Sequence, residues 1–147
     1  MTKAAQSTGV YLTRLLQTYG VEVVFGIPGV HTVELYRGLP QTKIRHITPR
    51  HEQGGGFMAD GYARARGGFG VCMGVGGPGI TNMLTPLATA YSDRSPVLAL
   101  AGSLPFTWRG RGGFQDATPS GISDVDMVRP VTVFAQEIPH LSLHQPQ

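Results

Sequence analysis

Residues 71–91 read VCMGVGGPGITNMLTPLATAY, and this stretch decides the fold class. The apolar run at residues 71–75 predicts a buried strand, and the glycines and proline of residues 76–79 predict a tight loop. Apolar side chains then recur at helical spacing over residues 80–91, which predicts a helix. A buried strand that leads through a glycine turn into a helix is typical of the βαβ units of α/β proteins.

The alternation of strand and helix continues on both sides of this stretch. We predict further strands at residues 21–25, 44–48 and 97–101, and further helices at residues 8–19, 31–39 and 52–66. Residues 97–101 are all apolar, so we expect that strand to be buried on both faces. Right-handed crossovers between such strands give a parallel sheet. The predicted fold is therefore α/β and doubly wound, with a mainly parallel sheet and helices on both faces.

Beyond residue 102 the pattern is less regular. Residues 103–123 contain several glycines and a proline, and we predict a long connection of the kind that is often functional. We assign residues 1–136 to one domain. Residues 137–147 hold two prolines and two histidines without periodicity, so we expect a tail or a truncation point.

Composition excludes several classes of function. The chain has 147 residues and a formal net charge of +3, with its arginines spread along the sequence rather than in a basic stripe. We therefore expect no nucleic-acid binding, and we interpret Arg109 and Arg111 as ordinary surface residues. The single cysteine, Cys72, excludes a disulfide scaffold and a zinc cluster and fits the cytoplasm. No segment reaches the length of a membrane span.

Three consecutive glycines, Gly54 to Gly56, open the predicted helix at residues 52–66. Each costs about 1 kcal/mol relative to alanine inside a helix, so roughly 3 kcal/mol must be recovered by close packing against that turn. We expect another backbone, or the surface of a partner, to approach there.

Glu52 is the acidic residue most indicative of a site. It lies where the second strand passes into the third helix, at the carboxyl edge of the sheet, where open α/β folds bind ligands. We expect the loops at residues 26–29, 51–56 and 74–79 to converge there, leaving Glu52 as the ionisable group on a largely apolar surface. The alternative is a glutamate that only caps its own helix. His31 and His51 flank the same edge, and histidines in loops are more often solvent-facing than catalytic.

Residues 74–79 also satisfy the pattern G-x-G-x-x-G, which in dinucleotide-binding domains places a pyrophosphate on a helix N-terminus. Such domains carry an acidic residue about 20 positions later for the ribose, and the next strand here ends without one. The sequence contains no nucleophile elbow and no Walker motif. A structural turn remains the simpler interpretation of these glycines taken alone.

Four blocks of sequence together resemble the N-terminal pyrimidine-binding domain of thiamine diphosphate enzymes. They read VFGIPG at residues 24–29, RHEQG at 50–54, MADGYAR at 58–64 and GPGITN at 77–82. The similarity covers residues 8–135 and is to the branch of acetolactate synthases, pyruvate oxidases and 2-oxo acid decarboxylases. It implies a flavodoxin-like three-layer domain.

The resemblance also implies residue roles. A glutamate in the position of Glu52 hydrogen-bonds a ring nitrogen of the aminopyrimidine and favours the tautomer that activates the cofactor. The remaining expected roles are cofactor packing for Ile27, Pro28, Gly29, Pro78 and Asn82, cofactor contact for Gln115, and the substrate entrance for Phe114 and Gln115. The family commonly has hydroxyl residues where Val75 and Gly76 stand here, and Val30 replaces the serine of benzoylformate decarboxylases.

The family holds the diphosphate and Mg²⁺ in a second domain with a Gly-Asp-Gly motif, which this sequence lacks. We therefore expect thiamine diphosphate as cofactor, with Mg²⁺ held by a diphosphate-binding domain of another subunit or of a longer chain, and no metal ligands in these residues. A homodimer or larger oligomer, a 2-oxo acid substrate and no activity of this chain alone are further expectations. The alternatives are a non-catalytic α/β association module, one subunit of a split 2-oxo acid decarboxylase, or a flavodoxin-like nucleotide-binding domain.

Overall fold

Four parallel strands form the centre of the molecule, in the order β2-β1-β3-β4. The structure is a computed structural model that describes residues 7–138. The strands are β1 (Val23–Gly26), β2 (Arg45–Ile47), β3 (Gly70–Val75) and β4 (Val97–Gly102). The chain first passes from β1 to β2 on one side and then crosses to β3 on the other. This reversal places a topological switch point between β1 and β3, where doubly wound folds form their ligand crevice.

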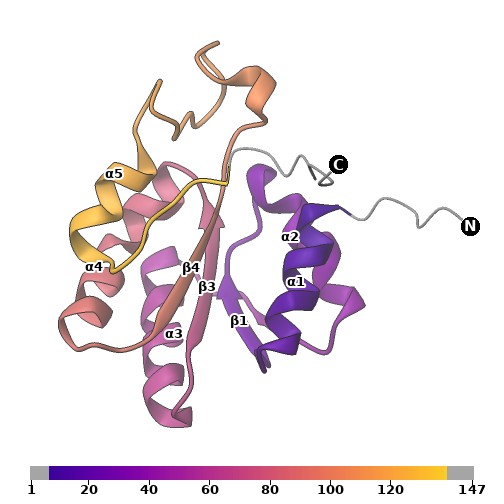
Figure 1. Ribbon diagram of the computed structural model, residues 1–147, viewed down its shortest axis with the longest axis vertical. Helices are drawn as coiled ribbons and strands as arrows, with labels where there is room; N and C mark the ends of the chain where they lie inside the picture. The colour runs from indigo at the N-terminus through magenta and orange to yellow at the C-terminus, as the bar shows by residue number, and fades with distance from the viewer. Residues whose placement is uncertain (1–6, 139–147) are drawn as a thin grey trace, which may run out of the picture.

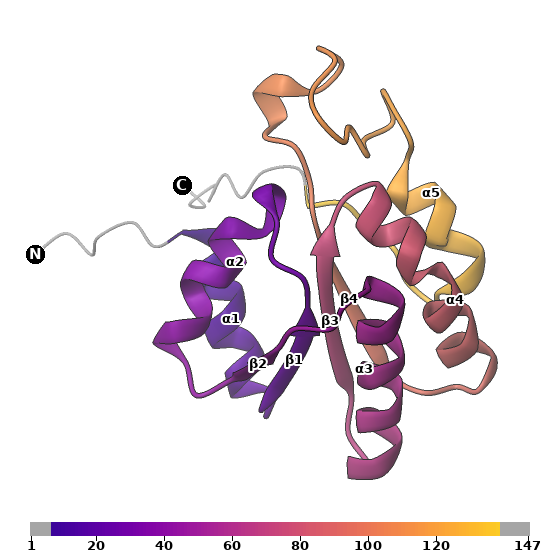
Figure 2. The ribbon, with the colours of Figure 1, turned by 180° about the vertical axis from the view of Figure 1, so that it is seen from behind.

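Helices cover both faces of the sheet, which confirms the predicted class. Figures 1 and 2 show α1 (Thr8–Thr18) and α2 (Val33–Gly38) on one face, and α3 (Glu52–Arg66) and α4 (Pro78–Ser92) on the other. The short helix α5 (Asp124–Val128) lies outside α4. Single 3₁₀ turns complete the fold at η1 (Val30–Thr32), η2 (Leu39–Gln41), η3 (Phe106–Trp108) and η4 (Arg129–Val131).

The core consists of two apolar clusters, one on each face of the sheet. Because successive side chains of a strand point to opposite faces, Val24 packs in one cluster while Val23 and Phe25 pack in the other. In β3 the same alternation separates Met73 from Cys72. Burial raises the pKa of the Cys72 thiol to about 12, so this cysteine is an inert core residue.

The helix boundaries follow local signals in the sequence. The Ser7 side chain accepts a hydrogen bond from the Val10 amide and caps α1. Gly67, with φ of 72°, ends α3 in the left-handed conformation that glycine favours. The predicted helix at residues 31–39 is shorter in the structure, because 3₁₀ turns flank α2 and Pro40 lies in the second of them.

Strand β4 corrects one expectation. It was predicted to be buried on both faces, but it is the edge strand of the sheet and is only partly covered, with Leu98 37% exposed. A continuous apolar run indicates a strand without showing whether other elements cover it. In residues 7–138, β4 pairs with β3 on one side and has no strand on the other.

The connection at residues 103–123 contains the 3₁₀ turn η3 and is otherwise irregular, as predicted. Helix α5, which follows it, was not predicted because it has only five residues. Glu137, the first residue of the expected tail, forms an ion pair with Arg109 of the connection. The rest of that tail, residues 139–147, lies outside the described residues. No helix in residues 7–138 is both long and apolar enough to cross a bilayer.

Candidate functional site

Glu52 is the first residue of α3 and lies at the carboxyl edge of the sheet, as predicted. The Asn82 side-chain amide, in the second turn of α4, donates a hydrogen bond of 2.9 Å to Oε2 of Glu52. Both side chains are half-buried. The structure therefore joins two of the predicted site residues, which come from different helices and lie 30 positions apart in the sequence.

Helices α3 and α4 approach closely just behind this pair. A Cβ atom on Gly56 would lie 2.5 Å from Cγ of Pro86, and one on Gly55 would lie 3.1 Å from Cγ of Pro49. Two of the three glycines thus have the close approach that the sequence predicted. The approaching groups are two prolines of the chain itself.

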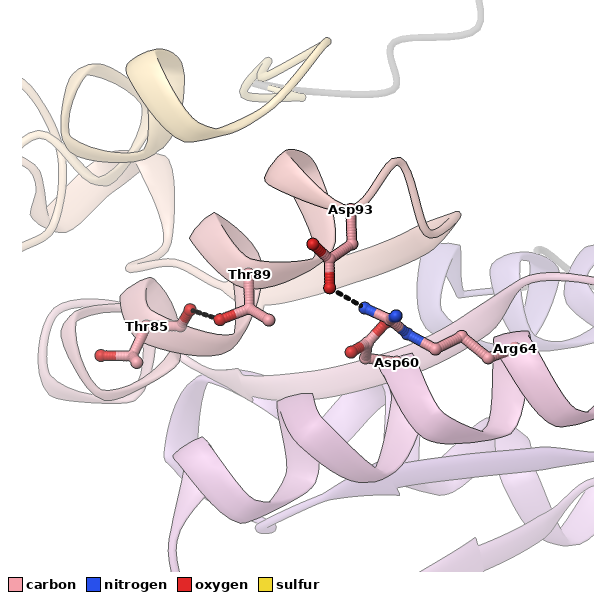
Figure 3. Close-up of polar contacts among 5 residues, drawn as sticks. All are labelled: Asp60, Arg64, Thr85, Thr89 and Asp93. Atoms are coloured by element: carbon pink, nitrogen blue, oxygen red, sulfur yellow. Dashed lines mark hydrogen bonds and ion pairs between the residues drawn. The ribbon is translucent and has the colours of Figure 1, made fainter.

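A second contact joins the far ends of the same helices. Figure 3 shows Arg64 of α3 between two carboxylates. Its Nε donates a 2.9 Å hydrogen bond to Oδ1 of Asp60, and its Nη2 donates a 2.6 Å hydrogen bond to Oδ2 of Asp93. Asp60 is buried, and Arg64 beside it holds the pKa of that carboxyl below its usual range. In the same part of α4, the Thr89 hydroxyl donates a 3.0 Å hydrogen bond to the Thr85 carbonyl oxygen. The helix pair that carries Glu52 and Asn82 is therefore fixed at both ends.

The loop after β1 forms one wall of the edge. Ile27 and Pro28 lead into Gly29, whose amide donates a 3.0 Å hydrogen bond to the buried Thr32 hydroxyl. A Cβ on Gly29 would lie 2.3 Å from Cγ1 of Val75. The backbone of Gly29 is extended, a conformation that any residue can adopt. Glycine is therefore required there because the two loops leave no room for a side chain. Ile27 is half-buried and Pro28 is exposed, so this loop presents apolar surface at the edge.

The loop between β3 and α4 forms the facing wall. Gly77 has a φ of 67°, and Pro78 follows at the first turn of α4, where proline is favoured. A Cβ on Gly76 would lie 2.7 Å from the Gly102 carbonyl oxygen. Gly76 therefore has no room for a side chain in this protein, because the end of β4 closes over it.

Phe114 and Gln115 also reach this edge. The Phe114 ring is 69% exposed and lies 6.4 Å, centroid to centroid, from the ring of His31. Gln115 has a φ of 54° and lies near Gly77, where a Cβ would be 3.9 Å from its own Cβ. The structure thus places the predicted entrance residues beside the two loops.

The two flanking histidines differ in their surroundings. His51 caps α3 by accepting a 3.2 Å hydrogen bond from the Gln53 amide, which is a structural role. Nδ1 of His31 is buried without a hydrogen-bond partner, and burial lowers the pKa of this imidazole. Within residues 7–138, no three His, Cys, Asp or Glu side chains group as metal ligands do.

Asp124 was not among the predicted site residues. Both of its carboxylate oxygens accept the Gly77 amide proton, at 3.1 Å each. The two residues are 47 positions apart, so no local pattern connects them. The one local signal near Asp124 was the capping pattern Ser123-x-x-Asp126, which could have located the start of α5. In the structure the Ser123 side chain accepts a hydrogen bond from the Asp126 amide.

The fold and the edge together define an α/β domain that presents a carboxylate, oriented by an amide, at the switch point of a parallel sheet. Residues 6–123 match the family described as thiamine pyrophosphate enzyme, N-terminal TPP binding domain. The chain belongs to this family, which confirms the resemblance seen in the sequence. Dinucleotide binding and the nucleotide-binding function of a flavodoxin-like domain are therefore set aside, while the flavodoxin-like fold itself agrees with the structure.

Curated relatives agree with this assignment. The chain is 59% identical over 95 residues to a probable 2-ketoarginine decarboxylase of Pseudomonas aeruginosa, covering 65% of this chain and 17% of that protein. It is 49% identical over 111 residues to an acetolactate synthase of Mycobacterium avium, covering 75% and 18% of the two chains. A probable acetolactate synthase large subunit of Methanocaldococcus jannaschii is 42% identical over 111 residues, covering 76% and 19%. The chain thus spans less than a fifth of these relatives.

Proposed function

We propose that Glu52 activates the aminopyrimidine of thiamine diphosphate in an enzyme that decarboxylates or ligates 2-oxo acids. The observation that carries this proposal is the hydrogen bond from Asn82 to Glu52. It engages Oε2 and leaves Oε1 as the oxygen that can share a proton with a ring nitrogen. A half-buried carboxylate strengthens such sharing, because hydrogen bonds are stronger where water is excluded.

The surroundings of Glu52 fit a flat heterocycle better than a highly charged ligand. The walls are glycine, proline and apolar side chains, with Ile27, Pro28 and Gly29 on one side and Pro78 on the other. When bound, thiamine diphosphate supplies an electron sink for the carbon that loses carbon dioxide. The residues of this chain would orient the ring and exclude water, and Phe114 and Gln115 would line the substrate entrance.

The diphosphate and Mg²⁺ are proposed to be held by a second domain. Acidic groups suited to Mg²⁺ do not cluster in the described residues, and the relatives are more than five times as long as the matched region. We propose that residues 1–136 form the pyrimidine-binding domain, that a diphosphate-binding domain of another subunit or of a longer chain completes the site, and that the assembly is a homodimer or larger in the cytoplasm.

The substrate is proposed to be a 2-oxo acid. One relative is described as a decarboxylase of 2-ketoarginine, and others are described as acetolactate synthases. The chain is more similar to the described decarboxylase, at 59% identity, than to the described acetolactate synthase, at 49%, which favours an oxo acid derived from an amino acid.

Substitution of Glu52 by Gln tests the proposed role. In a complex with the diphosphate-binding domain, thiamine diphosphate and Mg²⁺, we expect Glu52→Gln to lower turnover of 2-oxo acids by roughly 10²- to 10⁴-fold, the usual contribution of a proton-transfer group. Thermal unfolding should be nearly unchanged. Glu34→Gln is the matched control, because Glu34 is exposed and pairs only with Arg37 of its own helix. Near-full turnover in Glu52→Gln would contradict the proposal.

A non-catalytic association module is the alternative. Calorimetric titration with thiamine diphosphate and Mg²⁺, with and without the diphosphate-binding domain, separates the two. Tight binding that requires both domains supports the proposed enzyme or a split enzyme. Absence of binding in both settings supports the module.

A further inference from the structure

We propose that Asp124 is a positioning residue of the cofactor site: its carboxylate fixes the Gly76–Gly77 turn and so sets where α4 presents Asn82 to Glu52. This inference rests on the proposed function of Glu52. The contact itself does not, so the two can be tested separately.

The turn needs an external support. Gly77 adopts a φ of 67° and a ψ of −109°, a conformation open to glycine and strained for other residues. As the residue before the first turn of α4, Gly77 has no side chain with which to cap the helix. Asp124 supplies a carboxylate from outside the helix, and both of its oxygens lie 3.1 Å from the Gly77 nitrogen.

Neighbouring groups leave the turn little freedom. A Cβ on Gly76 would lie 3.0 Å from Cβ of Ala117 and 3.2 Å from Oδ2 of Asp124. The Asp124 amide in turn donates a 3.1 Å hydrogen bond to the Ala117 carbonyl. Asp124 is therefore held by its own backbone while its side chain holds Gly77.

The effect reaches the site through the start of α4. Pro78 follows Gly77 directly, and Asn82 lies on the next turn of the same helix, 2.9 Å from Glu52. A change at Gly77 would move the first turn of α4 as a unit, since the helix is rigid and its far end is fixed to α3 by Arg64. The Asn82–Glu52 hydrogen bond would then lengthen or break.

Burial of Asp124 supports a functional reason for the contact. Burial raises the pKa of Asp124 to about 6, although the Gly77 amide bond acts in the opposite direction. Ionisation of this group in the fold therefore costs stability, and the hydrogen bond only partly offsets that cost. Asp124 lines a surface cavity. The other charged residues that line it are Asp126, Arg129 and Glu137, and Glu137 is paired with Arg109.

Solution NMR of the full 147-residue chain tests the proposal without cofactor. We expect the Gly77 amide proton and the Asn82 side-chain amide to shift together between pH 5 and 7.5 as Asp124 ionises. In Asp124→Ala, hydrogen exchange at Gly77 should accelerate about tenfold or more, the scale expected for losing a charge-assisted hydrogen bond. The Asn82 side-chain amide should move toward its free position, while the Cys72 amide in the core stays protected.

Two further variants complete the design. Asp124→Asn keeps one acceptor oxygen and should give intermediate exchange at Gly77, which also provides a test if Asp124→Ala does not fold. Asp126→Ala is the control on the same short helix, because Asp126 is exposed and pairs with Arg129, and it should leave both amides unchanged.

The outcomes are distinct. If neither pH nor the Asp124 variants change the chemical shift or the hydrogen exchange of the Gly77 amide, Asp124 does not hold Gly77 and the inference is wrong. If Gly77 responds while the Asn82 side-chain amide does not, Asp124 is only structural, and the positioning role is again wrong. Near-full turnover of Glu52→Gln would refute the proposed function whatever Gly77 does.

Discussion

Gly56 and Gly61 lie in the same helix, yet their surroundings differ. A Cβ on Gly56 would lie 2.5 Å from the Pro86 ring, whereas nothing lies within 4 Å of one on Gly61. The helix-breaking cost of glycine is the same at both positions. The difference in packing alone therefore decides which of the two can be replaced.

We predict opposite effects of alanine at these two sites. Gly56→Ala should lower the free energy of unfolding by about 1–3 kcal/mol, because the methyl group overpacks the contact between α3 and α4. Gly61→Ala should raise the free energy of unfolding by roughly 1 kcal/mol, because alanine has a higher helix propensity than glycine and Gly61 is exposed. Urea denaturation measures both, and equal effects would show that Pro86 yields to the added methyl.

Asp124 gives a pH-dependent prediction at the same scale. Its pKa is raised to about 6 in the fold, so its favourable contribution is complete below the ordinary aspartate pKa and is lost as the pH rises through about 6. Relative to Asp124→Asn, wild type should therefore lose stability between pH 4 and pH 7. We expect a change on the order of 1 kcal/mol, reduced by partial exposure to water.

Asp126→Asn should show the opposite slope. Hydrogen bonds from Ser123 and Arg129 hold the pKa of Asp126 below its usual range. Its contribution is therefore present above the ordinary aspartate pKa and is lost as the pH falls. Thermal melts of both variants from about pH 2 to 7 provide the comparison, and parallel slopes would contradict the assigned directions.

At the scale of elements, α3 and α4 act as one unit. The crossing at Gly56 and Pro86 lies near the site, and the Asp60–Arg64–Asp93 cluster lies at the far ends (Figure 3). Asp60 is only 6% exposed, so its charge depends on Arg64. The orientation of Asn82 toward Glu52 is thus a property of the helix pair rather than of either residue.

Arg64→Met should destabilise the chain more than Arg66→Met. The first variant leaves Asp60 buried without its charged partner, whereas Arg66 and Glu22 are both about half exposed and contribute little. Because Arg64 lowers the pKa of Asp60, its contribution is lost as the pH falls, and the penalty of Arg64→Met should shrink in acid. A chemical-denaturation series from about pH 2 to 7 tests this, and an unchanged penalty would contradict it.

At the scale of the whole molecule, the sheet of the described residues has two edge strands, β2 and β4. Within residues 7–138, no strand pairs with β4 on the side away from β3, and Leu98 on this strand is 37% exposed. Such edges associate readily with other strands. The same edge ends at Gly102, next to the turn that carries the candidate site.

We predict that the isolated chain self-associates at high concentration and that Leu98→Lys reduces this association. A charge on an edge strand opposes pairing with a second strand. Light scattering at increasing concentration measures the effect, with Tyr11→Lys, an exposed aromatic on α1, as the control. Equal association in both variants would exclude β4 as the contact.

The class of the fold and the family could be predicted from the sequence alone, and the sequence also singled out Glu52 as the candidate site residue. Hydrophobic periodicity and glycine turns depend on neighbours within a few residues, so they can be read locally, and four spaced motifs specify the family. Glu52 and Asn82 are 30 positions apart in the sequence. The loops that precede their helices both follow parallel strands, and the carboxyl ends of parallel strands meet at one edge of the sheet.

The packing of helices on the sheet, in contrast, sets which groups contact each glycine, which strands lie at the edges, and what holds Gly77. Gly56 meets Pro86, β4 lacks a second neighbour in the described residues, and Asp124 reaches back over 47 positions to the turn before α4. Each of these contacts joins segments far apart in the chain. Their existence depends on how the layers pack, and no local pattern of residues encodes that packing.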